Sequence, residues 1–226
     1  MLPPTPASVQ NRFIDVAHRI EHGMITYKGM PGPIISDYRS REASRGYYAS
    51  GTEFHIGRIE MVANTGTYID APFHRFADGK DLSELPLESL ADIPGIRIST
   101  DSNRAIDAAF FTGRDLAGKA VLVHTGWSRH WLTEKYFEDP PFLTQKAAEF
   151  LVESKVALVG IDSMNIDDIN DKARPVHTAF LKANTPIVEH LTNLEEVPAE
   201  GFRFFAVPVK VKSFGSFPVR AFAIVS

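Results

Sequence analysis

The sequence has no cysteine among its 226 residues. This absence excludes disulfide bonds, thiolate metal sites and a cysteine nucleophile. Long apolar runs are missing too, since no stretch reaches the ~18 residues that a membrane span requires. The first residues also lack the basic and apolar regions of a secretory signal. We therefore expect a cytoplasmic protein that does not interact with membranes.

Positive charge is scarce as well, because 24 Lys and Arg face 28 Asp and Glu, which leaves a net charge of -4. A nucleic-acid or anionic-membrane partner would require a clustered basic face, and the sequence contains none. The hydrophobic content of 44% and charged content of 23% are typical of a globular protein with an ample core. A small molecule is therefore the expected partner.

The length of 226 residues fits one large domain. Residues 1–12 are rich in proline and read as an N-terminal arm, whereas 13–226 form the predicted domain. Alternating or continuous apolar runs predict strands. These lie at 13–17, 54–62, 96–98, 119–125, 157–161, 187–189, 202–211 and 219–225.

Helical spacing of apolar residues is clearest at 144–154, where Thr144 is suited to cap the first turn. Two further short helices are predicted, one at 177–183 and one at 82–93 with Pro86 in its first turn. Strands that alternate with a few helices indicate an α/β protein but do not define one topology.

The segment N-T-G-T-Y-I-D-A-P-F-H at 64–74 gathers more reactive side chains than any other stretch. Gly66 permits unusual backbone angles and Pro72 fixes its own, so Asp70 and His74 should lie on stiff, non-helical backbone. The near-alternation at 54–62 predicts that a strand with one buried face leads into this loop. A lone Asp or His in a loop is usually a turn or capping residue, and only a second motif favours a site.

That second motif is His177, followed twelve residues later by Glu189. Together the two motifs resemble the cyclase family of metal-dependent hydrolases, which includes bacterial arylformamidase (kynurenine formamidase) and isatin hydrolase. The family signature reads H-x-G-T-H-x-D-x-P-x-H. Its matching positions here are Gly66, Thr67, Asp70, Pro72 and His74, whereas Asn64 and Tyr68 stand where the family has two histidine ligands.

The resemblance implies an α/β fold of the cyclase-family swivelling β/α type, with a mixed, partly closed sheet and flanking helices. It also implies a homodimer or larger homo-oligomer. The implied cofactor is one divalent metal, Zn or Mn, held by Asp70, His177 and Glu189. A metal-activated water would attack a small amide, ester or lactone, with His74 in proton transfer. Catalytic roles are also expected for Glu189 and Tyr68. Tyr27 is an expected substrate-binding residue, because its segment lines the pocket in the family. Phe73 and Trp127 could line the same pocket, although each of these aromatic side chains could equally belong to the core.

The two replaced histidines leave other hypotheses open. Asn64 offers only a neutral oxygen, and Tyr68 would bind a metal only as phenolate, from an ordinary pKa of about 10. A metal-free enzyme would use His74 with Glu189 or Asp70 as acid and base, with Tyr68 donating to an oxyanion. A non-catalytic binding protein would keep only the pocket.

Two further clusters have simpler interpretations. Arg39, Arg41 and Arg45 could form a clamp for a substrate carboxylate, but a solvated charged loop is the favoured reading. The acidic residues between 162 and 171 lack the spacing of an EF-hand calcium loop. Solvated turns and helix caps account for most of them.

Overall fold

A computed structural model describes residues 11–100 and 104–225 of this chain. Residues 1–10 of the expected N-terminal arm lie outside the described part. The chain joins the central sheet at Arg12, where β1 (Arg12–Asp15) begins beside the last strand, β13 (Phe222–Val225).

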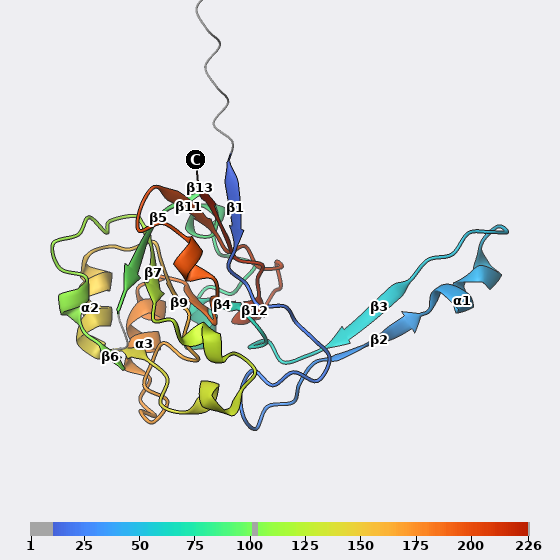
Figure 1. The fold of residues 1–226 in the computed structure, drawn as a ribbon, viewed down its shortest axis with the longest axis horizontal. Helices are drawn as coiled ribbons and strands as arrows, with labels where there is room; N and C mark the ends of the chain where they lie inside the picture. The colour runs from blue at the N-terminus through green and yellow to red at the C-terminus, as the bar shows by residue number, and fades with distance from the viewer. Residues whose placement is uncertain (1–10, 101–103, 226) are drawn as a thin grey trace, which may run out of the picture.

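A nine-stranded sheet organises the body, in the order β1-β13-β11-β5-β7-β9-β10-β4-β12 (Figure 1). Its four central strands β5, β7, β9 and β10 run parallel to one another. The strands outside these four pair antiparallel, from β11 outward on one side and from β4 outward on the other. The remaining strands are β4 (Tyr68–Asp70), β5 (Ile93–Ser99), β7 (Ala120–His124), β9 (Leu158–Ile161), β10 (Ile187–Glu189), β11 (Phe202–Phe205) and β12 (Ser216–Pro218). This mixed, curled sheet with few helices confirms the predicted α/β fold class.

Both faces of the central strands are buried, as their continuous apolar runs predict. In β7, Val121 and Val123 pack into the cluster beneath α2 (Gln145–Glu153) and α3 (Pro175–Lys182). Ala120 and Leu122 face the opposite cluster, which the outer strands and C-terminal loops complete. Successive side chains of a strand point to opposite faces, so one apolar run supplies two cores.

The two helices on this sheet confirm the predictions at 144–154 and 177–183. The Thr144 hydroxyl accepts the Ala147 N–H at 3.2 Å, which is the expected cap of α2. The helix predicted at 82–93 is wrong. That stretch forms one turn of 3-10 helix at Leu87–Ser89, and Ile93 already pairs with Phe204 in the sheet. Leu87 is 63% exposed, so the apolar spacing there did not mark a helix face.

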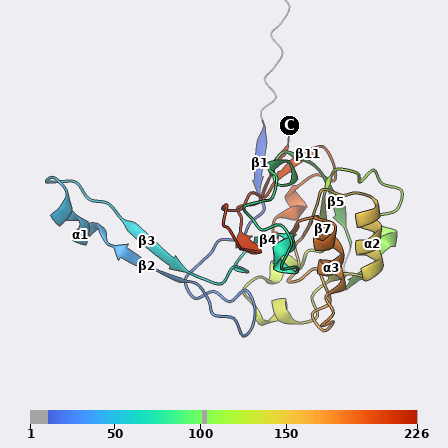
Figure 2. The same ribbon diagram turned by 180° about the vertical axis from the view of Figure 1, so that it is seen from behind.

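An arm of two strands projects from the body (Figures 1 and 2). Its strands β2 (Ile34–Arg39) and β3 (Ile56–Glu60) pair only with each other, and the tip carries α1 (Arg41–Ser44). The predicted strand at 54–62 therefore exists, but its predicted buried face is wrong, because all five residues of β3 are exposed. A second pair of short strands, β6 (Ala105–Ile106) and β8 (Phe142–Leu143), lies on the body.

Candidate active site

Strand pairing brings the two sequence motifs together. β4 pairs antiparallel with β10, which sets Asp70 opposite Ile187 and Tyr68 opposite Glu189. On its other edge β4 pairs with β12, which sets Ser216 opposite Asp70. Asp70 thus lies on a strand of the sheet rather than in the loop that its sequence predicts.

Asp70 is fully buried, and its two carboxylate oxygens differ in their partners. Oδ1 accepts a short hydrogen bond from the Ser216 hydroxyl. Oδ2 has no hydrogen bond in the described part of the chain and lies 3.6 Å from Nε2 of His177. A buried carboxylate oxygen without a partner is costly, so this atom points to a cation that belongs beside it.

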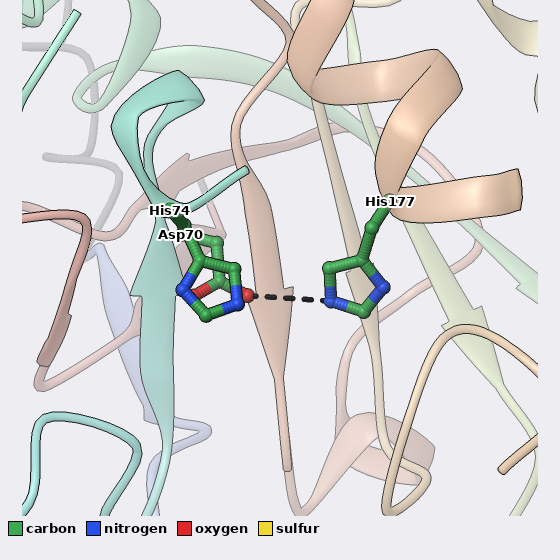
Figure 3. Close-up of side chains that lie close together, drawn as sticks. All are labelled: Asp70, His74 and His177. Carbon is green, nitrogen blue, oxygen red and sulfur yellow. Dashed lines mark ion pairs between the residues drawn. The ribbon is translucent and has the colours of Figure 1, made fainter. Parts of the chain in front are cut away.

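His177 lies in the first turn of α3 and is held in place by Asp167. One Asp167 oxygen lies 2.6 Å from Nδ1 of His177, and the same carboxylate accepts the backbone N–H groups of Val176 and His177. Nε2 of His177 consequently points toward Asp70, as Figure 3 shows. Asp167 is a helix cap, as the sequence suggested for this acidic loop, but it is 1% exposed rather than solvated.

His177 is held as a cation among carboxylates. Burial alone would lower the pKa of its imidazole, but Glu189, Asp167 and Asp70 together raise that pKa to about 10. Nε2 lies 3.7 Å from Oε1 of Glu189 in addition to its contact with Asp70. A divalent ion that displaces this proton would have neutral imidazole as its ligand and would place two positive charges, instead of one, among the same carboxylates.

Glu189 is engaged by three donors. Its Oε1 accepts the Ile166 N–H at 2.6 Å, and its Oε2 accepts the phenol groups of Tyr68 and, at 3.2 Å, Tyr27. Burial and the neighbouring Glu189 raise the pKa of both phenols well above the usual value. Tyr68 therefore stays protonated and donates to Glu189, which is not the behaviour of a phenolate metal ligand.

His74 ends the 3-10 turn Pro72–His74 that follows β4, and its side chain is 36% exposed. Its Nδ1 lies 2.9 Å from the Ser216 hydroxyl, the group that also binds Asp70. Gly215 packs on the backbone of His74, since a Cβ built there would lie 2.5 Å from His74 Cα. No larger residue fits this approach, which aligns Ser216 with both side chains.

Ligand atoms of Asp70, His74 and His177 all lie within 4.8 Å of one another. The residues fit a divalent ion, because two imidazoles and a carboxylate are ordinary zinc or manganese ligands and Oδ2 of Asp70 lacks a partner. Glu189 was predicted as a metal ligand, but it lies beside this group and both of its oxygens accept hydrogen bonds. The third residue with a ligand atom close to those of Asp70 and His177 is His74.

A cavity of about 250 Å³ opens over this cluster. It is lined by Tyr27, Met30, Asn64, Tyr68, His74, Arg75, Asn165, Arg174, His177 and Glu189. Of the three expected substrate-binding residues only Tyr27 is among them. Phe73 is not, and neither is Trp127, whose indole donates instead to the backbone of Tyr136 at 3.0 Å.

Several residues of the site had no signal in the sequence. Ser216 lies 146 positions from Asp70, and only the β4–β12 pairing joins them. Arg75 and Arg174 line the cavity, whereas the arginines named as a possible clamp lie on the arm. There Arg45 pairs with Glu53 at 2.8 Å, and Arg39 stacks on Tyr47. The favoured reading of that cluster, a solvated charged segment, agrees with this placement.

Comparisons with known proteins show which proteins this chain resembles in sequence and fold. The sequence profile of the Cyclase family matches residues 14–168. A kynurenine formamidase of Bacillus cereus is 28% identical over 212 residues, which cover 93% of this chain and 96% of the relative. The structure of isatin hydrolase A from Ralstonia solanacearum superposes with a TM-score of 0.79 at 24% identity, over 96% of this chain and 92% of that one.

A third relative is a predicted metal-dependent hydrolase from Bacillus stearothermophilus. Its structure superposes with a TM-score of 0.76 at 26% identity and covers 96% of this chain and 100% of its own. Within the described ranges, no helix has the length and apolar character to cross a membrane.

Proposed function

This chain belongs to the cyclase family, and from that premise we propose that it is a hydrolase that cleaves the C–N bond of a small amide. The relatives named kynurenine formamidase and isatin hydrolase support this reaction class. The observation that carries the proposal is the buried group of Asp70, His177 and Glu189 beneath a small cavity. Such a group is costly to bury, and catalysis at the cavity floor accounts for it.

We propose that Asp70 and His177 hold one divalent metal, zinc or manganese, with His74 within reach as a third group. The similarity to the metal-dependent hydrolase and the unpartnered Asp70 Oδ2 support this cofactor. When bound, such an ion polarises a carbonyl and lowers the pKa of a water molecule. Asn64 and Tyr68 in place of two histidines favour a single ion over a pair.

The side chains around the ion have separate tasks in this proposal. Asp167 keeps Nε2 of His177 directed at the cavity floor, and Tyr68 and Tyr27 fix the Glu189 carboxylate by donating to it. His74 has Nδ1 beside Ser216, which leaves Nε2 for proton transfer to the leaving nitrogen. Tyr27 also forms part of the cavity wall that receives the substrate.

A metal-free acid–base enzyme has less support. The raised pKa of His177 keeps that imidazole protonated at neutral pH, so without a metal it cannot accept a proton from water. Acid–base catalysis would then depend on His74 with Glu189 or Asp70, and both of these carboxylates already face the His177 cation. A binding protein without catalysis would not account for the similarity to hydrolases over more than nine-tenths of the chain.

Metal analysis of protein purified without added metal tests the proposal, together with turnover of formanilide before and after chelation. We expect about one ion per chain, and loss of both metal and turnover in Asp70→Ala. A loss of ~10³-fold in kcat/KM corresponds to about 4 kcal/mol of transition-state stabilisation, within the range expected for a Lewis acid. Asp171→Asn, in the same acidic loop as Asp167 but exposed, is the matched control. Full turnover of metal-free protein would refute the metal-dependent mechanism.

We further propose that the protein forms a homodimer or larger oligomer through its arm. Isolated two-stranded hairpins are marginal in water, yet this arm exposes Ile35, Ile56 and Ile59 at 43%, 42% and 50%. Residues 34–60 carry four Arg and four Asp or Glu, so the arm has no net charge to repel a second copy. Sedimentation of Ile35→Ser/Ile59→Ser beside the wild type tests this, and an unchanged sedimentation coefficient would contradict it.

A further inference from the structure

Two arginines at the cavity have no role in the mechanism proposed above. Arg75 follows His74 directly, and Arg174 precedes His177 by three residues. Both line the same cavity as those histidines. The backbone segments that deliver two candidate ligands therefore also deliver two guanidinium groups to the space above them.

Both arginines are anchored on one side by hydrogen bonds. Nε of Arg75 donates to the Thr178 hydroxyl at 3.2 Å, and that hydroxyl donates to the Arg174 carbonyl at 2.7 Å. Nη1 of Arg174 donates to Oδ1 of Asn165 at 3.1 Å. Thr178 thus ties the two arginine segments together, and Asn165 positions the second guanidinium at the cavity.

The backbone of Arg174 adopts a φ of 50°, in the left-handed region. A residue with a Cβ is strained there, so surrounding contacts must hold this conformation. The same turn begins α3 and thereby sets the directions of both Arg174 and His177.

No carboxylate neutralises either guanidinium in the described ranges of the chain. Some arginines of the body have such partners, for example Arg104 with Asp168 at 3.3 Å and Arg203 with Asp92 at 2.6 Å. Others, such as Arg114, bind a backbone carbonyl outside the cavity. The carboxylates at the cavity floor, Asp70 and Glu189, are directed at His177 instead. The cavity therefore combines an acidic floor with two cationic side chains that lack an anion.

We propose that the substrate is a small amide that carries a carboxylate, which Arg75 and Arg174 bind while the amide lies over Asp70 and His177. The amide half of this inference rests on the proposed function, and the carboxylate half rests on the arginine pair. Guanidinium groups bind carboxylates through paired, charge-assisted hydrogen bonds. A cavity of about 250 Å³ suits a small molecule rather than a peptide chain.

Hydrolysis of two matched substrates tests the inference: formanilide and 4-formamidobenzoate, which differ by one carboxylate. We expect wild-type kcat/KM to favour the carboxylated substrate by at least about tenfold, the value of one charge-assisted hydrogen bond or more. In Arg75→Gln and Arg174→Gln this preference should fall about tenfold, mainly through KM. Arg114→Gln is the control, because that exposed arginine donates to the Phe110 carbonyl at 3.1 Å and lies outside the cavity.

Calorimetric binding of benzoate separates this inference from the proposed function, because it needs no turnover. One outcome is that neither formanilide nor 4-formamidobenzoate is hydrolysed, but benzoate binds to the wild type and not to Arg75→Gln. In that case the carboxylate subsite stands and the proposed reaction fails. If both substrates are hydrolysed equally and neither arginine variant changes benzoate binding, the subsite is refuted and the reaction stands. Circular dichroism checks whether Arg174→Gln is folded. If Arg174→Gln unfolds, the Arg75→Gln variant still tests the subsite, because Arg75 is exposed.

Discussion

The floor of the candidate site buries charged groups, whereas the projecting arm exposes apolar ones. The floor buries three carboxylates and an imidazole, with Asp70, Asp167 and Glu189 at most 1% exposed. The arm exposes isoleucine side chains on both of its strands and Tyr38 on β2, which is 70% exposed. Buried charge and exposed apolar surface are each costly unless something covers or pairs with them.

The two regions differ in how many of their polar or apolar groups find a partner within the same chain. At the floor almost every polar atom has a partner, because Asp167 binds His177, and Tyr68 binds Glu189. Among the described residues, Asp70 Oδ2 has no hydrogen bond and faces Nε2 of His177 at 3.6 Å, which suggests a site for an ion. The arm has no covering surface from its own body, which suggests a second protein surface. The kind of unsatisfied group thus indicates the kind of missing partner.

Among these tests we expect the largest effect from a substitution of His74, the most exposed side chain at the floor. In His74→Ala we expect about a hundredfold loss of kcat, the size of a general acid–base contribution. If His74 only transfers protons, the metal content should stay at the wild-type value while kcat falls. Loss of the metal in the same variant would make His74 a ligand instead, and unchanged kcat would remove it from the mechanism.

Asp167 tests how far the floor depends on positioning. Asp167→Asn should weaken metal affinity ten- to a hundredfold, as removal of a carboxylate that orients a histidine ligand typically does. A metal titration monitored by competition with a chelating dye would measure the shift. Asp168→Asn alters the neighbouring carboxylate, which binds Arg104 rather than His177, and should leave affinity unchanged. Equal effects of the two variants would contradict the positioning role.

His18 offers a contrast to His177, because it is buried without a carboxylate. Burial lowers the pKa of His18 to about 4, below its value of 6.5 in an unfolded chain. The unfolded state therefore binds more protons between these values, so stability is complete above pH 6.5 and falls as the pH drops toward 4. Between pH 7 and pH 5 we expect a loss of about 2 kcal/mol from this group. Urea denaturation at pH 7 and at pH 5 measures this loss of unfolding free energy, which should be about 2 kcal/mol smaller in His18→Leu than in the wild type.

The smallest effect should come from the arm. Ile59→Ala should change the unfolding free energy of dilute protein by less than about 0.5 kcal/mol, as surface substitutions do. Ile69→Ala, in the fully buried strand β4, should cost roughly 2 to 5 kcal/mol. Denaturant titration of the two variants compares the arm and the body directly. A large cost for Ile59→Ala at low concentration would mean that the arm packs on its own body.

Local pattern determined much of this protein from the sequence alone. The continuous apolar runs of β7 and β9 and the capped helix α2 follow from side-chain periodicity, which depends on neighbours along the chain. The two motifs also identified Asp70, His74, His177 and Glu189, the four side chains that lie together around the cavity floor. Periodicity failed at 82–93, which forms one turn of 3-10 helix at Leu87–Ser89 before Ile93 pairs with β11.

The tertiary structure alone decided which partners these side chains have. Strand pairing brings Ser216 to Asp70, and the turn before α3 brings Arg174 to the cavity of His74 and His177. Alternation within 54–62 predicted a strand but could not show what covers it, because burial depends on elements distant in the chain. Sequence spacing therefore determines the form of a segment, and long-range packing determines whether its charges and apolar groups are satisfied.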